Sequence, residues 1–207
     1  MTQSLILGVP READPDERRV ALVPAAVAGL KKAGAEVLIQ KDAGKAAGFP
    51  DDQYAFKGAM IVADRDEVFA RANVILQVRS LGACAEASLS DIARLRKGQL
   101  LVAGCEPLWC PDVIAKAAAT GATVFSLELV PRITRAQSMD ILSSMATIAG
   151  YRAVLLAAIE SPRMFPMMMT AAGTLKPARV LVIGAGVAGL QAIASAKRMG
   201  AVVFGYD

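Results

Sequence analysis

The 207-residue sequence contains no histidine. Imidazole acid–base chemistry, Ser-His-Asp catalysis, Cys-His catalysis and histidine-ligated zinc are therefore excluded within these residues. A dehydrogenase mechanism that takes its proton donor from a histidine of this chain is excluded for the same reason.

Aromatic residues and long basic runs are also scarce. Aromatic residues make up 5% of the chain, and its basic residues are dispersed in pairs such as Arg18-Arg19 and Lys31-Lys32. The formal net charge is only +4, although the isoelectric point is about 9.1. Nucleic-acid sites combine clustered basic residues with aromatic ones, so we expect no such site here.

The three cysteines are Cys84, Cys105 and Cys110. No signal peptide precedes them, which predicts a reduced, cytoplasmic protein. The four-residue gap between Cys105 and Cys110 has no second pair to complete a metal site. We therefore expect no metal, and interpret the cysteines as small core or loop residues.

The chain is 55% hydrophobic and has a mean hydropathy of +0.44, so a sizeable core is available. Its longest uncharged run, from Val180 to Ala196, contains three glycines and reads as strand, turn and helix. This pattern argues against a membrane-spanning helix, and we predict no membrane span in the chain.

The first 130 or so residues alternate short apolar strands with helices. The expected strands are 5–9, 36–39, 60–62, 74–78, 99–103 and 123–126. The expected helices are 25–32, 51–58, 64–71, 88–97 (beginning at Ser88 or Ser90) and 111–120. Repeated βα units predict an α/β domain over residues 1–136, flavodoxin-like, with a parallel sheet covered by helices on both faces.

A second region follows this predicted domain. Helical periodicity from Ser138 to Ile159 predicts a long connecting helix, within a connector of residues 137–163. The remaining residues, 164–207, begin with a loop and then give the first βαβ unit of a Rossmann domain. Because such a domain needs about four more strands, we expect a truncated domain that is inactive alone.

The most informative motif lies within residues 164–207. A buried strand over 179–183 leads into G-A-G-V-A-G, then a helix from Leu190 to about Met199 and a strand over 201–206. This order is typical of a dinucleotide-binding βαβ unit, although tight βα turns also use glycine for packing alone. The candidate cofactor-binding residues are Gly184, Ala185, Gly186, Val187, Ala188, Gly189 and Asp207.

Each element of the motif has a physical role. Gly184 allows the tight turn, Gly186 lets a pyrophosphate approach the backbone, and Gly189 lets the helix pack closely. The helix N-terminus favours the negative pyrophosphate. Asp207 follows Gly189 at close to the spacing of about 20 residues expected of a carboxylate that accepts from a ribose 2′-hydroxyl. An acid there repels a 2′-phosphate and so favours NAD(H) over NADP(H).

A second polar cluster precedes the long helix. It contains Arg132, Gln137, Asp140 and Ser143. Ser138 with Asp140 can cap the helix. Alternatively, Arg132, Asp140 and Ser143 can bind a carboxamide, since Asp140 and Ser143 share a helical face. Spacing alone leaves both interpretations open.

Longer stretches carry a family resemblance. The segment R-I-T-R-A-Q-S-M-D-I-L-S-S (132–144), the segment F-P-M-M-M-T-A-A-G-T (165–174) and the glycine motif resemble the NAD(H)-binding domain of proton-translocating NAD(P) transhydrogenase. The opening residues 8–24 resemble the wider alanine dehydrogenase and transhydrogenase superfamily. The resemblance covers essentially the whole chain.

This resemblance implies a dimeric oxidoreductase that binds NAD(H) and exchanges hydride with NADP(H) on another domain or subunit, coupled to proton movement through a membrane part. The protein would be cytoplasmic and held on the inner side of the plasma membrane by partner subunits. Arg132, Asp140 and Ser143 would hold the nicotinamide end, and Gln137 would lie where the two rings meet. Such transfer needs positioning and no general acid or base.

Two alternatives remain. The related alanine dehydrogenases use a histidine and a lysine at their substrate; here histidine is absent, and Arg79 stands near the expected lysine position. Arg19 matches the arginine that binds the carboxylate substrate in those enzymes, but a salt bridge would explain it equally well. The second alternative is a non-catalytic nucleotide-binding or dimerisation module.

Overall fold

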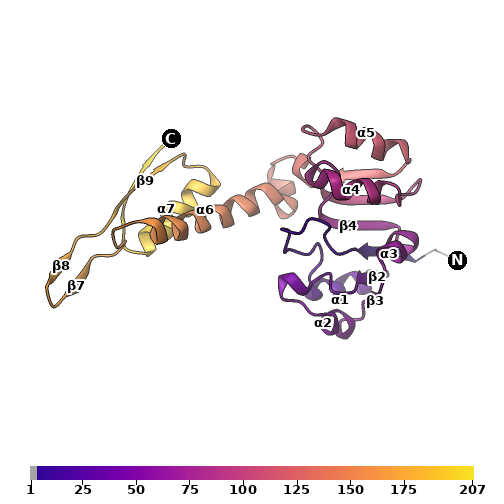
Figure 1. Cartoon of the computed structure of the whole chain (residues 1–207), viewed down its shortest axis with the longest axis horizontal. Helices are drawn as coiled ribbons and strands as arrows, with labels where there is room; N and C mark the ends of the chain where they lie inside the picture. Colours follow the sequence, from indigo (N-terminus) through magenta and orange to yellow (C-terminus); the bar gives the residue numbers. More distant parts are fainter. Residues whose placement is uncertain (1–3) are drawn as a thin grey trace. The chain divides into compact units, whose positions relative to one another are not determined.

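The computed structural model describes residues 4–207, apart from the side chains of residues 85 and 86. The chain divides into two compact units, Met1–Val130 and Pro131–Asp207 (Figure 1). Each unit has its own hydrophobic core, so each contains the interactions that fix its own site.

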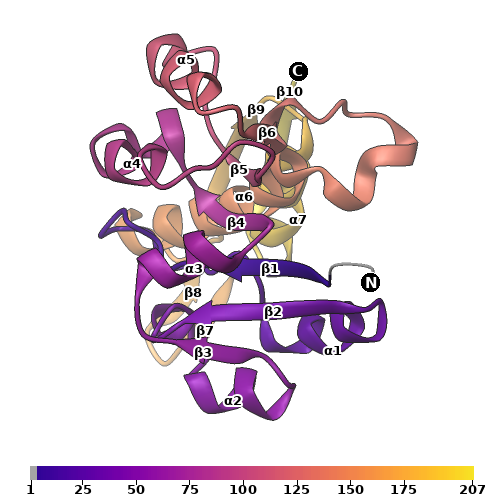
Figure 2. The same cartoon turned by 90° about the vertical axis from the view of Figure 1, so that its right-hand side faces the viewer.

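A six-stranded parallel sheet forms the centre of the first unit (Figure 2). Its order is β3-β2-β1-β4-β5-β6. The strands are β1 (Leu5–Val9), β2 (Ala35–Gln40), β3 (Met60–Val62), β4 (Val74–Arg79), β5 (Leu100–Gly104) and β6 (Thr123–Ser126). The predicted parallel α/β class is confirmed. The order is the flavodoxin-like one with a short additional edge strand, β3.

Helices cover both faces of this sheet. They are α1 (Pro24–Lys32), α2 (Asp51–Phe56), α3 (Arg65–Arg71), α4 (Ala85–Ile92) and α5 (Pro111–Ala119). Buried residues of α3, α4 and α5 share one core cluster with the sheet, while those of α1 and α2 share the other. The strands are therefore buried on both sides, which explains why they read as nearly continuous apolar runs.

Helix α4 differs from its prediction, because it begins at neither Ser88 nor Ser90. A 3-10 turn over Leu81–Cys84 leads directly into the helix, and Cys84 occupies the N-cap position. Ser88 is buried within the helix, and the Ser90 hydroxyl donates to the Ala87 carbonyl at 3.0 Å. The two serines are thus used inside the helix rather than at its start.

The second unit combines helices α6 (Ile141–Glu160) and α7 (Val187–Arg198) with four strands. Strands β9 (Arg179–Ile183) and β10 (Val202–Tyr206) pair in parallel, with Arg179 opposite Val202 and Ile183 opposite Tyr206. Val154 of α6 and Ala192 and Ala196 of α7 form its buried core. The unit thus consists of a βαβ motif with α6 packed against its helix.

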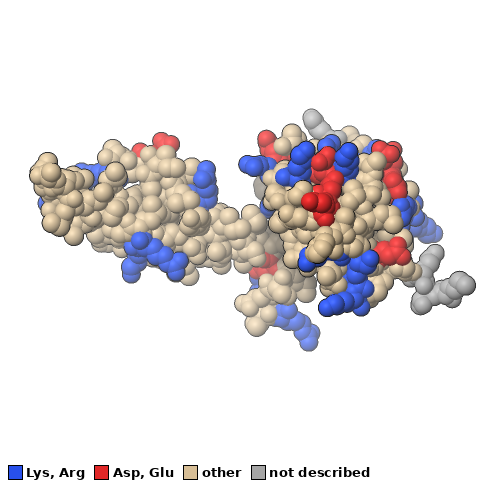
Figure 3. Space-filling view, turned by 90° about the horizontal axis from the view of Figure 1, so that it is seen from below, with Lys and Arg blue, Asp and Glu red and all other residues tan. Residues whose placement is uncertain are grey.

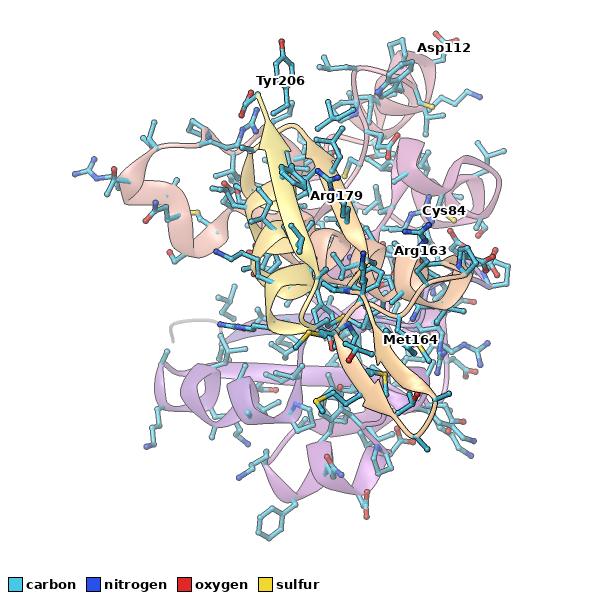
Figure 4. All side chains as sticks on the ribbon, turned by 90° about the vertical axis from the view of Figure 1, so that its left-hand side faces the viewer. Cys84, Asp112, Arg163, Met164, Arg179 and Tyr206 are labelled. Atoms are coloured by element: carbon cyan, nitrogen blue, oxygen red, sulfur yellow. The ribbon has the colours of Figure 1, made fainter. Side chains whose placement is uncertain are left out.

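Residues 167–174 form a hairpin, so the predicted loop is wrong. Strands β7 (Met168–Thr170) and β8 (Gly173–Leu175) pair antiparallel (Figure 4). The Thr170 hydroxyl donates to the Gly173 carbonyl at 2.8 Å, and Gly173 has a φ of +127°, which favours glycine. Every residue of both strands is exposed, so the apolar alternation that announces a buried strand is missing.

Among the described residues, α6 is the one helix long and apolar enough to cross a membrane by length and composition. The helices of protein cores often pass the same test. Here Gly150 and Val154 are buried, and Val154 belongs to the core that α6 shares with α7. The expectation that the chain has no membrane span therefore stays a prediction.

Candidate functional site

The glycine turn joins β9 to α7 in a conformation that requires its glycines. Gly184 has a φ of +91°, which residues with a side chain rarely adopt. A Cβ on Gly189 would lie 1.7 Å from the Gly184 carbonyl oxygen. A Cβ on Gly186 would meet nothing within 4 Å, so the space beside it is open to a ligand.

Helix α7 begins at Val187, three residues before the predicted start at Leu190. Gly189 is tolerated in the first turn because it packs directly on the preceding turn of the chain. No side chain of the described residues caps this helix. The N–H groups of its first turn are therefore available to an anion.

Two hydrogen bonds connect the end of β10 to the glycine turn. The Gly184 N–H donates to the Tyr206 carbonyl at 2.7 Å. The Ala185 N–H donates to Oδ2 of Asp207 at 2.9 Å. The predicted ribose ligand is thus already in contact with the predicted pyrophosphate turn. Figure 4 shows Tyr206 at the free end of β10.

The second polar cluster lies at the start of α6. Asp140 is the N-cap, so the helix begins after it and not at Ser138. Its Oδ1 accepts from the Ser143 N–H at 2.9 Å, and its Oδ2 accepts from the Ser143 hydroxyl at 2.7 Å. These bonds to Ser143, with a smaller contribution from Arg132, hold the pKa of Asp140 below its usual value. The carboxylate is therefore ionised at neutral pH.

Two hollows in this unit join the cluster to the glycine turn. One, of about 660 Å³, is lined by residues that include Arg132, Gln137, Asp140 and Ser143. The other, of about 720 Å³, is lined by residues that include Arg132, Ser143, Gly150, Gly184, Gly186 and Gly189. Arg132, Ser143 and Val187 line both hollows, so the two candidate groups of residues border one continuous groove.

Several residues that line this groove were not predicted from the sequence. Thr147 lines the first hollow and Gly150 the second. Both follow Ser143 at helical spacing on α6, and this spacing is the signal that could have found them. Gly150 has a second role, because a Cβ on it would lie 2.1 Å from the Ala188 carbonyl oxygen of α7. The backbones of α6 and α7 are therefore in direct contact beside the glycine turn.

The first unit holds charged residues where its strands β1 and β4 end. Arg19 is paired with Glu17 at 2.6 Å, and Arg79 is paired with Asp14. The Arg19 guanidinium is the main reason that the pKa of Glu17 is lowered. The Glu12 carboxylate accepts from the N–H groups of residues 78 and 79 at 2.7 and 3.1 Å. Both guanidinium groups thus already have carboxylate partners from their own unit.

The cysteines have structural surroundings. Cys105 is fully buried, and burial raises the pKa of its thiol to about 12. Its N–H donates to Glu128 at 2.8 Å, and the Glu106 N–H donates to the same carboxylate oxygen. The described residues contain no disulfide partner for Cys84 or Cys110, and no group of three or more histidine, cysteine or acidic residues that could hold a metal.

The strand, glycine turn, helix, strand and acid define a βαβ unit of the dinucleotide-binding type. Two family models cover nearly the whole chain. The alanine dehydrogenase/PNT N-terminal domain matches residues 8–149, and the alanine dehydrogenase/PNT C-terminal domain matches residues 153–207. The chain belongs to the alanine dehydrogenase/PNT family.

Individual relatives fall on both branches of that family. The first of the separate chains that make up NAD(P) transhydrogenase subunit alpha in Rhodospirillum rubrum is 45% identical over 201 residues, covering 97% of this chain and 52% of the relative. Alanine dehydrogenase of Mycobacterium tuberculosis is 34% identical over 203 residues, covering 95% of this chain and 52% of that enzyme. The chain spans about half the length of these relatives.

Solved structures agree with this assignment. A transhydrogenase from Sinorhizobium meliloti superimposes with a TM-score of 0.88 at 45% identity, covering 97% of this chain and 56% of that one. An L-alanine dehydrogenase gives a TM-score of 0.83 at 27% identity, with 98% and 55% covered. The fold expected from the sequence is therefore confirmed by both branches.

Proposed function

We propose that this chain is the NAD(H)-binding component of a transhydrogenase and passes hydride between NAD(H) and NADP(H) held on another domain or subunit. The continuous groove from Arg132 and Asp140 to the glycine turn carries this proposal. It offers donors and acceptors at one end and free helix N–H groups at the other, as a dinucleotide requires. The transhydrogenase relatives also match at higher identity than the alanine dehydrogenases.

The hydrogen bonds at the start of α6 suggest how the nicotinamide carboxamide is oriented. Because the Ser143 hydroxyl donates its proton to Asp140, its oxygen remains free to accept from the carboxamide NH2. The Arg132 guanidinium supplies donors for the carboxamide oxygen. Asp140 holds Ser143 in place through two bonds, and Gln137 lines the same hollow. NAD(H) itself supplies the hydride, so these residues need only orient the ring.

Cofactor choice provides the first test. We expect NADH to bind at least about tenfold more tightly than NADPH, because the Asp207 carboxylate repels a 2′-phosphate and accepts from a 2′-hydroxyl. Parallel fluorescence titrations of the full-length protein with the two nucleotides measure this ratio. Equal affinities would show that the assignment of NAD(H) is wrong.

An alanine dehydrogenase-like activity is the alternative. That chemistry needs a cationic group free to bind the substrate carboxylate, whereas Arg19 and Arg79 are paired with Glu17 and Asp14. We therefore expect no oxidation of NADH by pyruvate and ammonia under conditions that support exchange with an added NADP(H)-binding component. Binding of NADH without either reaction would favour the second alternative, a non-catalytic module.

The proposed reaction also requires partners. The relatives named as subunit alpha, or as one portion of it, imply further subunits or domains that bind NADP(H) and cross the membrane. We propose that this chain is cytoplasmic and lies at the inner side of the plasma membrane through those partners. Coupling to proton movement would then reside in the membrane domain.

We further propose that the chain is a homodimer, with the β7–β8 hairpin in the interface. An isolated two-stranded sheet is marginally stable in water, and its only flanking charges in residues 161–178 are Arg163 and Lys176. Met164, Met167 and Met169 are each more than half exposed. Figure 3 shows one face of the second unit with few charged side chains. Homodimer interfaces are more apolar than those between transient partners, which favours a second copy.

Met169→Asp tests this interface. The side chain is 84% exposed, so a carboxylate there leaves the folded chain intact but opposes burial at an apolar interface. We expect light scattering after size exclusion to give a dimer for the original protein and a monomer, or a dimer at least about tenfold weaker, for the variant. Phe56→Asp, at an equally exposed site on α2, should remain dimeric. A dimeric Met169→Asp protein would contradict the proposed interface.

A further inference from the structure

We propose that Asp207 has a second role besides ribose recognition: it positions the pyrophosphate-binding turn, so that the ribose and pyrophosphate subsites share one side chain. This inference rests on the proposed function and assigns to Asp207 a contact with the protein itself. The observation is the hydrogen bond from the Ala185 N–H to Oδ2 of Asp207 at 2.9 Å.

The surroundings of Ala185 explain why this bond affects the turn. Ala185 lies between Gly184, whose φ is +91°, and Gly186, which has open space beside it. Glycines lose more backbone freedom on folding than other residues, so a turn with two of them needs added constraints. The Gly184 N–H is bonded to the Tyr206 carbonyl, and the next N–H along the chain is bonded to the Asp207 side chain.

The geometry also divides the Asp207 carboxylate between two tasks. Oδ2 accepts from the turn, while none of the hydrogen bonds found among the described residues reaches Oδ1. A carboxylate accepts at both oxygens, so Oδ1 can accept from a ribose hydroxyl while Oδ2 keeps the turn in place. Loss of Asp207 therefore weakens binding at the ribose and also loosens the turn that receives the pyrophosphate.

Paired changes in protein and ligand separate the two roles. The ligands are NADH and its analogue that lacks both hydroxyls on the adenosine ribose, titrated into the full-length protein and its Asp207→Ala and Asp207→Asn variants. We expect Asp207→Ala to weaken the analogue about threefold to tenfold, because a hydrogen bond that orders the turn is lost. Asp207→Asn keeps an oxygen acceptor for Ala185 and should bind the analogue as the original protein does.

The Ala185 amide gives a readout that needs no ligand. Its hydrogen exchange should be slow in the original protein and in Asp207→Asn, and at least about tenfold faster in Asp207→Ala. Glu160→Ala, which removes an exposed carboxylate at the end of α6, is the charge-matched control and should change neither readout.

Two results would overturn the inference. Unchanged affinity of Asp207→Ala for the analogue would confine Asp207 to the ribose, as would unchanged exchange at Ala185. If NADH and the analogue bind the original protein equally well, the proposed ribose contact fails instead. The exchange measurement then still decides whether Asp207 orders the turn.

Discussion

Replacement of Gly150 by alanine is expected to destabilise the second unit by about 3 kcal/mol, near the upper end of what overpacking usually costs. The added Cβ would lie 2.1 Å from the Ala188 carbonyl oxygen, and this is a backbone atom that no rotamer change can move. Helices α6 and α7 must therefore separate. Chemical denaturation, followed by circular dichroism, measures the loss in unfolding free energy.

Gly29→Ala is the matched control for this experiment. Gly29 also lies inside a helix, α1, but a Cβ there meets nothing within 4 Å. Alanine is the better helix former, so this change should stabilise the protein by up to about 1 kcal/mol. Similar small effects of the two substitutions would show that the α6–α7 contact is not as close as described.

Replacement of Arg132 by alanine should slow hydride exchange about 100-fold while changing the melting temperature little. Misplacement of a reacting ring by about 1 Å can cost that much, and Arg132 lines both hollows at the candidate nicotinamide end. Arg132 is exposed, so its loss leaves no cavity in the core. Exchange between NADH and an NADP⁺ analogue, with the NADP(H)-binding component present, measures the effect.

Arg135→Ala provides the comparison for Arg132→Ala. Arg135 lies on the same stretch of chain, in the 3-10 helix over Thr134–Met139, and is also exposed, but it lines neither hollow. Its removal should leave exchange within about twofold of the original rate. Equal losses in the two variants would point to a general effect of charge near the groove and would remove Arg132 from the proposed site.

Much of the fold could be predicted from the sequence, because buried parallel strands are short apolar runs bounded by turn residues. The strand over Thr123–Ser126 and the helix start at Pro24 agree with the structure. The start of α4 could not be read in this way, because serine serves equally well as a cap and within a helix. The hairpin at Met168 was missed because its residues are exposed, so no apolar alternation marks its strands.

The candidate site was only partly accessible from the sequence. The spacing of Asp140 and Ser143 suggested that they share a helical face, and the structure adds the two hydrogen bonds between them. The importance of Gly150 depends on which helix crosses α6 and how closely. That crossing is set by tertiary packing, which local spacing does not contain.

The contact at Gly150 makes α6 a ruler between the two ends of the groove. Asp140 caps its start and Gly150 touches α7, about 15 Å further on at about 1.5 Å per residue. Between these points the number of residues matters more than their identity, because an insertion of one residue would turn Asp140 and Ser143 by about 100° relative to the glycine turn. Evolution can therefore exchange many of the exposed side chains of this segment, but it cannot easily change its length.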